Sequence, residues 1–241
     1  MDEQRANEPV LTEGDLEGVA VLFDLDGTLI DTAGDLAAAT NHVLAAAGRP
    51  SLSTEIMRKF VGFGARAMIK AGFEATGAPA AEADLDTYVS DFLDYYLAHI
   101  DDFSKPFPGA VDAIGVLRAA GAKIGICTNK REGPTRQLIE KLALTNLFDA
   151  IVGGDTAAAP KPDPAPVHLC LRGTGAMSGV FVGDSDTDIR AAAAANMPVI
   201  VVDFGYGPID LADPSKPLLS SYNGLPRAIA QTLSIAPSDT S

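Results

Sequence analysis

The stretch AVLFDLDGTLIDT, residues 20 to 32, places two carboxylates directly after a short apolar run. Its first residues predict a buried β-strand, and the alternation of side chains along a strand puts Asp24 and Asp26 on the same face. Two anions this close repel each other, and burying them is unfavourable unless a cation or a shared proton compensates. The stretch therefore predicts a positive partner, which another part of the chain has to supply.

The composition is that of a globular protein with an acidic excess. Hydrophobic residues make up 47% of the 241, enough for one large domain or for a core with a smaller insertion. Lys and Arg together number 18 against 32 for Asp and Glu, a net charge of −14. Nucleic acid and anionic membranes are therefore not expected as partners, because phosphate groups require a basic surface. An anionic substrate would have to be attracted by a local cationic site.

Cysteine usage and the N-terminal sequence favour a soluble protein of the cytoplasm. Cys127 and Cys170 form no Cys-x-x-Cys pair, so we expect reduced, buried thiols rather than a disulfide or a zinc site. The acidic residues 1–18 lack the basic and apolar regions of a signal peptide. No apolar run approaches the roughly 20 residues that span a bilayer.

Apolar spacing divides the chain into an α/β part and a helical part. After one strand the spacing is helical to about residue 104, and short strands then alternate with helices. That alternation predicts a doubly wound parallel sheet with helices on both faces. We expect three parts: a flexible lead-in at 1–17, an α/β core formed by 18–33 and 105–235, and a helical cap at 34–104.

Polar residues follow four of the predicted strands at the point where each one ends. The strands VLFD, IGICTN, AIVGGD and VFVGDS all run from apolar into polar residues. Ligands of open α/β sheets bind outside the carboxyl ends of the strands. The chemistry should therefore come from the polar residues at those ends, namely Asp24, Asp26, Thr128, Asn129 and Asp184.

The sequence GDSDTD, residues 183–188, adds three aspartates at the end of the last of these strands. One of them suits a helix cap, but capping does not require three acids. A calcium loop of the EF-hand type is excluded for both acidic clusters, because a large aliphatic residue stands where that loop needs glycine. Oxygen ligands from two strand ends suit Mg²⁺, which would also relieve the repulsion between Asp24 and Asp26.

Two further short stretches carry groups that could bind phosphate. Lys161 lies between two prolines in APKPDP; a lone lysine is most often solvated, but the prolines stiffen the backbone and would fix its ammonium in one direction. Thr128 and Asn129 can donate hydrogen bonds to phosphate oxygens, although Thr-Asn is also common in ordinary turns.

Two other features of the sequence are interpreted as structural rather than functional. GFGARA, residues 62–67, fits the pattern of a dinucleotide-binding loop, but the residues before it are helical, which favours a turn between cap helices. His42, His99 and His168 lie on predicted helices without a metal-like pairing.

Four motifs in order, FDLDGTLID, CTN, PKPDP and GDSDTD, resemble those of the haloacid dehalogenase superfamily over about residues 19 to 203. FDLDGTLIDTAGDLAAATNHVLAAAG and VGFGARAMI look like the corresponding segments of phosphoglycolate phosphatases. The resemblance implies a Rossmann-like core, with the helical insertion as a cap of the C1 type.

The resemblance also implies a mechanism. Asp24 would attack phosphorus and form an aspartyl-phosphate, and Asp26 would protonate the leaving oxygen and then activate water. Thr128 and Asn129 would bind the phosphoryl oxygens, and Lys161 would neutralise charge and orient Asp24.

A binding site for Mg²⁺ is implied as well. The Asp24 carboxylate, the Asp26 backbone carbonyl and Asp184 would hold the ion, with Asp188 in support, directly or through water. All four motifs are intact, so we expect an active enzyme.

In such enzymes the cap is expected to recognise the leaving group. The carboxylate of phosphoglycolate would need a cationic or N–H-rich partner there, for which Arg66 is the first candidate and Lys70 the second. A surface arginine on a cap helix is the alternative interpretation of Arg66.

Several functions stay open at this point. The fold would equally serve a phosphatase of sugar phosphates, nucleotides or pyrophosphate, or a β-phosphoglucomutase-like enzyme. A dehalogenase is disfavoured because it would need neither Asp26 nor the Asp184 cluster, and the cap lysines do not lie in the context of a phosphonate hydrolase. A non-catalytic module that binds phosphorylated ligands or a partner protein is the alternative from another class. Monomer and homodimer are both compatible with the sequence.

Overall fold

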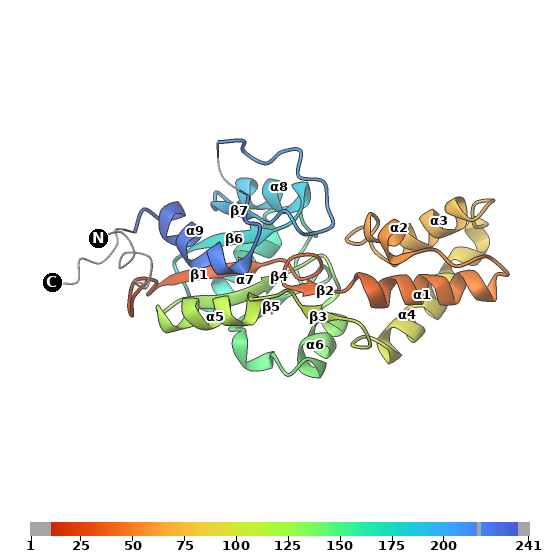
Figure 1. The fold of residues 1–241 in the computed structure, drawn as a ribbon, viewed down its shortest axis with the longest axis horizontal. Helices are drawn as coiled ribbons and strands as arrows, with labels where there is room; N and C mark the ends of the chain where they lie inside the picture. The colour runs from red at the N-terminus through yellow and green to blue at the C-terminus, as the bar shows by residue number, and fades with distance from the viewer. Residues whose placement is uncertain (1–10, 216–217, 236–241) are drawn as a thin grey trace, which may run out of the picture.

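The computed structural model describes residues 11–215 and 218–235. Its centre is a parallel sheet of five strands in the order β5-β4-β1-β6-β7 (Figure 1). The strands are β1 (Val19–Phe23), β4 (Lys123–Cys127), β5 (Ala150–Val152), β6 (Ser178–Gly183) and β7 (Val199–Val201).

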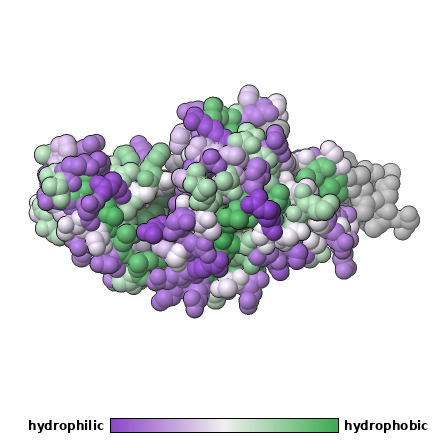
Figure 2. Space-filling model, turned by 180° about the vertical axis from the view of Figure 1, so that it is seen from behind, coloured by the Kyte–Doolittle hydropathy of each residue, from purple (hydrophilic) through white to green (hydrophobic). Residues whose placement is uncertain are grey.

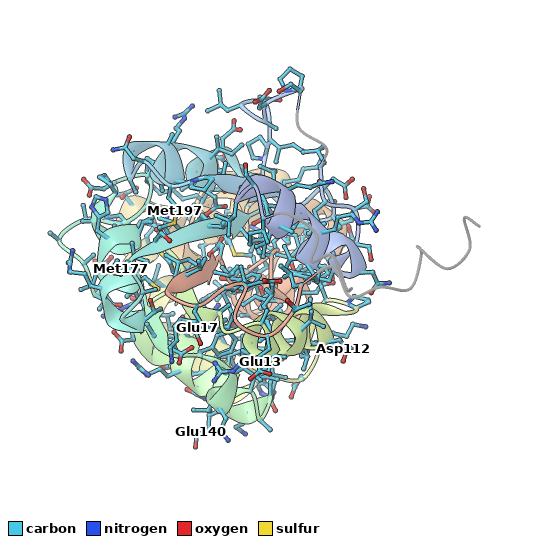
Figure 3. The ribbon with its side chains drawn as sticks, turned by 90° about the vertical axis from the view of Figure 1, so that its left-hand side faces the viewer. Glu13, Glu17, Asp112, Glu140, Met177 and Met197 are labelled. Atoms are coloured by element: carbon cyan, nitrogen blue, oxygen red, sulfur yellow. The ribbon has the colours of Figure 1, made fainter. Side chains whose placement is uncertain are left out.

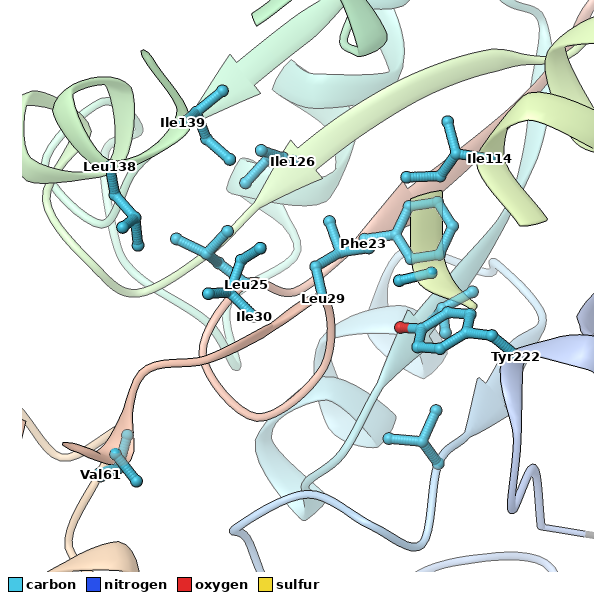
Figure 4. Packing of buried hydrophobic residues seen from close by; sticks show 14 of the residues in the cluster. Phe23, Leu25, Leu29, Ile30, Val61, Ile114, Ile126, Leu138, Ile139 and Tyr222 are labelled. Carbon is cyan, nitrogen blue, oxygen red and sulfur yellow. The ribbon is translucent and has the colours of Figure 1, made fainter. Parts of the chain in front are cut away.

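Helices cover both faces of this sheet: α5 (Ala110–Ala119), α6 (Glu132–Lys141) and α9 (Leu225–Thr232) on one, α7 (Ala165–Thr174) and α8 (Asp186–Ala194) on the other. Successive residues of β1 face opposite layers, because side chains alternate along a strand. Val21 and Phe23 pack in the first layer, where Phe23 lies beside Ile114 of α5 (Figure 4). Ala20 and Leu22 pack in the second. The predicted doubly wound α/β architecture is confirmed.

The chain between β2 (Ile30–Asp31) and β3 (Lys105–Pro106) is helical. It contains α1 (Ala33–Ala46), α2 (Thr54–Arg58), α3 (Ala65–Ala75), the 3₁₀ turn Glu82–Asp84 and α4 (Leu85–Ala98). These helices pack on one another and extend from the carboxyl end of β1 (Figure 1). Because β2 and β3 pair antiparallel, the chain leaves and re-enters the core at one place. The helices lie between residues 33 and 98, and the division of the chain into a core and a cap at 34–104 stays a prediction.

Part of the segment 1–17, predicted as a flexible lead-in, packs in the core. Leu11 and Leu16 are buried, and the N–H of Leu16 donates to the Ala120 carbonyl at 2.8 Å. These contacts tie the segment before β1 to the end of α5. The rest of the predicted lead-in, residues 1–10, lies outside the described part of the chain.

The structural interpretations of the glycine-rich loop and of two histidines agree with the structure. Gly62 and Gly64, with φ of 93° and 85°, lie in the turn between α2 and α3, and a helix rather than a strand precedes them. His42 and His99 each stack on Tyr95, with ring centroids 4.4 Å apart.

The cysteines, the helices and the surface of the described residues can be compared with the sequence. Cys127 and Cys170 are free and buried. Among helices of the described residues, none has the length and apolar character needed to cross a bilayer. Figure 2 shows hydrophilic and apolar residues mixed on one face of the molecule, with apolar ones near the junction of cap and core.

Candidate active site

The loop after β1 fixes the two aspartates of the opening stretch at the carboxyl end of the central strand. The Asp24 N–H donates to the Val182 carbonyl of β6 at 2.9 Å. Leu25 and Leu29 are buried and anchor the loop in the core (Figure 4). Gly27 has φ of 84°, and a Cβ there would lie 2.4 Å from Asp184 Oδ2. This position therefore requires glycine, because a side chain would displace an acidic group of the site.

Lys161 supplies a positive partner for Asp24, one of the two acids of the opening stretch. It is only 3% exposed, so the solvated lysine of an ordinary turn is excluded. Its Nζ lies 3.0 Å from Asp24 Oδ1 and donates to Asp188 Oδ1 at 2.6 Å. Asn129 holds its backbone on both sides: Asn129 Oδ1 accepts from Lys161 N at 2.8 Å, and Asn129 Nδ2 donates to Lys161 O at 2.9 Å.

Asp184 follows β6, the neighbour of β1 in the sheet. Its Oδ1 accepts from Thr28 Oγ1 at 2.9 Å, and its Oδ2 accepts from the backbone N–H of Tyr206 at 2.7 Å and of Gly207 at 3.3 Å. Three donors hold this carboxylate in one orientation, facing the end of β1.

Asp188 combines a structural role with a place in the acidic cluster. Its Oδ2 accepts from the Ser185 backbone N–H and hydroxyl, which completes a capping box at the start of α8. One carboxylate oxygen from each of Asp24, Asp184 and Asp188 lies within 4.8 Å of the others. Three converging oxygen donors at this spacing suit a hard divalent cation.

The pKa values of two of these carboxyls show how strongly the site favours positive charge. Burial raises the pKa of Asp24 to about 7; Lys161 opposes this shift, and Asp188, Asp184 and Asp26 add to it. Burial and Asp188 raise the pKa of Asp184 to about 6, against the hydrogen bonds that it accepts. Asp24 Oδ1 is also buried, and it accepts no hydrogen bond among the described residues. A cation beside these groups would compensate both burial and repulsion, so the residues present fit Mg²⁺.

A cavity of about 310 Å³ opens in front of Asp24. The predicted polar residues of the strand ends and of the following loops line it: Asp24, Asp26, Thr128, Asn129, Lys161 and Asp188. Thr128 is buried, and its Oγ1 accepts from the Lys130 backbone N–H at 3.2 Å, which leaves the hydroxyl hydrogen to point at a ligand. Because its side chain holds Lys161, Asn129 can offer a ligand its backbone N–H and one remaining amide hydrogen.

Asp26 is held by two residues that the sequence did not single out. Thr32 Oγ1 donates to its Oδ1 at 2.7 Å, and Lys130 Nζ lies 3.3 Å from the same oxygen. The Lys130 side chain is 8% exposed. Its place directly after CTN is the one sequence signal that could have identified it, since that strand end was already a predicted part of the site.

Arg66 and Lys70 lie on α3 and pair with acidic residues of the cap. Arg66 is ion-paired with Asp86 and Glu82, and Lys70 lies 3.0 Å from Glu82. About half of the Arg66 side chain is exposed, at 47%. Arg66 lines a second cavity, of about 360 Å³, which Asp26 also lines.

Comparisons with known proteins agree with this geometry. A family model described as haloacid dehalogenase-like hydrolase matches residues 21–202. A phosphoglycolate phosphatase of Caulobacter vibrioides is 43% identical over 80% of this chain and 82% of its own length. One of Mesorhizobium japonicum is 45% identical over 77% of this chain and 83% of its own.

A solved structure shares the whole architecture. The crystal structure of a predicted phosphoglycolate phosphatase from Haemophilus somnus superposes with a TM-score of 0.79 at 25% identity, covering 87% of this chain and 97% of that one. The family model's segment contains all four motifs and the parallel sheet except the first two residues of β1. The chain belongs to the haloacid dehalogenase-like hydrolase family and is a phosphoric monoester hydrolase.

Proposed function

We propose that this protein is a Mg²⁺-dependent phosphatase of 2-phosphoglycolate that works through an aspartyl-phosphate on Asp24. The observation that carries the proposal is the environment of Asp24. Its Oδ1 accepts no hydrogen bond from the described part of the chain, faces the Lys161 ammonium at 3.0 Å and borders a cavity at the carboxyl end of the central strand. A carboxylate held in this way is poised as a nucleophile.

Asp24 and Asp26 would divide the chemistry. An Asp24 oxygen forms a bond to phosphorus while the ester P–O bond breaks, and Asp26 gives a proton to the departing oxygen. Asp26 then takes a proton from the water that attacks the aspartyl-phosphate, which releases phosphate and restores Asp24. The hydrogen bond from Thr32 fixes the Asp26 carboxyl for both transfers.

Three groups would hold the phosphoryl oxygens in the cavity. Thr128 donates its hydroxyl, Asn129 donates its remaining N–H groups, and Lys161 balances the negative charge that gathers there. Asn129 also positions Lys161, through the two hydrogen bonds to its backbone.

The Asp24 carboxylate, the Asp26 carbonyl and Asp184 would hold Mg²⁺. When bound, the ion neutralises phosphoryl charge and relieves the repulsion among the acids. Asp188, whose two oxygens also accept from Lys161 and Ser185, would support the site directly or through water.

Phosphoglycolate is proposed as the substrate on the strength of the relatives, which carry that name and match this chain over four fifths of their length. Two buried, free cysteines fit a reducing compartment, so we place the reaction in the cytoplasm. A non-catalytic binding module would not need the second acid, Asp26, or the two residues that hold it, Thr32 and Lys130.

Phosphate release from a substrate panel tests this function. The panel holds 2-phosphoglycolate, several sugar phosphates, a nucleoside monophosphate, pyrophosphate and p-nitrophenyl phosphate, each with Mg²⁺ and with EDTA. We expect metal-dependent turnover led by 2-phosphoglycolate, abolished in Asp24→Asn. Turnover led by another compound would refute the substrate, and turnover in Asp24→Asn would refute the mechanism.

A further inference from the structure

A second cavity, of about 360 Å³, adjoins the phosphoryl cavity between the core and the cap. Asp26, Asn129 and Lys130 line both cavities, so the two meet at the acid that would protonate the leaving group. The cap contributes α3, α4 and the glycine-rich turn to its wall. A leaving group that departs from Asp26 would therefore enter this space.

Lys130 is a buried cation at the point where the cavities meet. Its Nζ lies 3.3 Å from Asp26 Oδ1 and 4.6 Å from the centroid of the Tyr96 ring on α4. The ion pair with Asp26 and the contact with the Tyr96 ring compensate the burial of this ammonium. The side chain therefore carries a positive charge that the cap and the core share.

Tyr96 brings a hydroxyl whose proton meets no acceptor within the described residues. The residue is 2% exposed and lines the second cavity; the Lys130 ammonium can donate to its oxygen, but the hydroxyl itself donates to no group among those residues. Burial raises the pKa of Tyr96 to about 12, so the hydroxyl keeps its proton and can donate it to an anion. A buried donor without a partner is unfavourable, and a ligand that accepts from it would remove that cost.

The other cations that line this cavity are more exposed and already paired. Arg66 pairs with Asp86 and Glu82 of the cap, and Arg131, 70% exposed, pairs with Asp155. Lys130 is the buried cation of this set, and its carboxylate partner, Asp26, belongs to the reaction itself.

We propose that Lys130 and Tyr96 form the subsite that binds the carboxylate of the leaving group, and so select phosphate esters of 2-hydroxy acids over those of neutral alcohols. This inference rests on the proposed function. In phosphoglycolate a single methylene separates the ester oxygen from the carboxylate, so an ester oxygen at Asp26 brings the carboxylate within reach of Lys130. Tyr96 donates a hydrogen bond to it from the cap, which makes recognition depend on cap and core together.

Selectivity between 2-phosphoglycolate and ethyl phosphate tests the subsite, because ethyl phosphate is the same two-carbon ester without the carboxylate. Lys130→Met removes the charge, and Tyr96→Phe removes only the hydroxyl and leaves the Lys130–Asp26 pair in place. We expect kcat/KM for 2-phosphoglycolate to fall about 10- to 100-fold in Lys130→Met and about 3- to 10-fold in Tyr96→Phe, mainly through KM. Turnover of ethyl phosphate should change little in Tyr96→Phe. In Lys130→Met it should also fall, because Lys130 pairs with Asp26, but by a smaller factor than turnover of 2-phosphoglycolate. Binding of glycolate, measured by calorimetry, should weaken in parallel.

The matched control is Lys123→Met, the same substitution at an exposed position at the start of β4, which should keep the wild-type ratio of the two substrates. If the ratio of kcat/KM for the two substrates is unchanged in both Lys130→Met and Tyr96→Phe, the subsite is refuted. An equal loss of kcat/KM for both substrates also refutes it, because Lys130 would then act only on Asp26. Loss of the ratio in Arg66→Met instead would move recognition to α3. A wild-type enzyme that does not prefer 2-phosphoglycolate would refute the proposed function itself.

Discussion

The Asp24 carboxyl is surrounded by three other carboxyls and one ammonium, those of Asp26, Asp184, Asp188 and Lys161. Burial raises its pKa to about 7, so a proton compensates part of the charge whenever no divalent cation is bound. Metal binding must displace that proton, and the affinity of the site for Mg²⁺ should therefore rise with pH. The same balance governs the stability of the metal-free protein.

Metal-free stability should respond to pH through Asp24. Because the folded pKa is about 7 and the unfolded pKa about 4, the folded state binds more protons between these values, and the free energy of unfolding falls as pH rises. Asp24→Asn removes this titration. In EDTA, we expect the variant and the wild type to unfold at similar temperatures near about pH 4, and the variant to be the more stable near about pH 8.

Calorimetric unfolding at a series of pH values measures this difference. Added Mg²⁺ should stabilise the wild type increasingly as pH rises and the variant much less. A difference between the two proteins that shrinks with rising pH in EDTA would contradict the raised pKa.

Among single residues, the sequence predicted those that stand in an unusual local pattern. Paired aspartates after a strand and a lysine between prolines both lie in the site. Thr28 could not be found in this way, because its partner is 156 residues away. For Lys130, whose partner is 104 residues away, the place after CTN was the one available signal. A lone lysine or threonine has no local pattern that reveals such a contact.

At the scale of the elements, Tyr206 connects the metal-site aspartate with the entrance to the cap. Its backbone N–H donates to Asp184 Oδ2 at 2.7 Å. Its hydroxyl donates to Asp31 Oδ1 at 2.5 Å and accepts from the N–H groups of Thr32 at 2.8 Å and Ala33 at 3.2 Å. One residue thus fixes the junction of β2 and α1 against the loop after β7.

Tyr206→Phe should separate these two functions. Loss of the hydroxyl leaves groups at the start of α1 without a partner, so we expect a loss of about 1–3 kcal/mol in the free energy of unfolding and faster proteolysis near residues 31–33. Mg²⁺ affinity should stay close to that of the wild type, because the backbone N–H to Asp184 remains.

Denaturant unfolding and Mg²⁺ titration measure both effects. Tyr88→Phe is the control, since the Tyr88 ring packs on Phe73 of the cap, away from the junction. Unchanged stability in Tyr206→Phe, or a loss equal to that of the control, would contradict this role.

The elements themselves were largely predictable. Apolar residues recur with one period in strands and with another in helices, and the strands and helices of the structure lie where these two patterns occur in the sequence. The packing of Leu16 was missed because its partner, Ala120, comes from the far end of α5, and two isolated leucines in an acidic segment form no period.

For the whole molecule, the sheet order decides where the chemistry lies. With β1 between β4 and β6, the polar residues that follow three parallel strands meet at one edge, beneath the cap. The sequence predicts this edge but not the pairing of core and cap side chains across it. Other acids lie far from this edge: Glu13, Glu17, Asp112 and Glu140 are all exposed, on the part of the molecule that Figure 3 views end-on.

A net charge of −14 should make the metal-free protein sensitive to salt. Screening weakens the repulsion among exposed acids, so we expect the melting temperature in EDTA to rise by a few degrees as NaCl increases from about 20 mM to about 300 mM. Differential scanning fluorimetry checks this. A melting temperature that falls over that range would show that favourable ion pairs outweigh the repulsion.

The central claim is that Asp24 carries the phosphoryl group during turnover. Acid quenching during turnover of 2-phosphoglycolate with Mg²⁺, followed by mass spectrometry of the peptide that contains residues 20–32, tests it most directly. We expect one phosphoryl group on Asp24, absent in Asp24→Asn. Steady release of phosphate without a labelled peptide, together with turnover in Asp24→Asn, would contradict it.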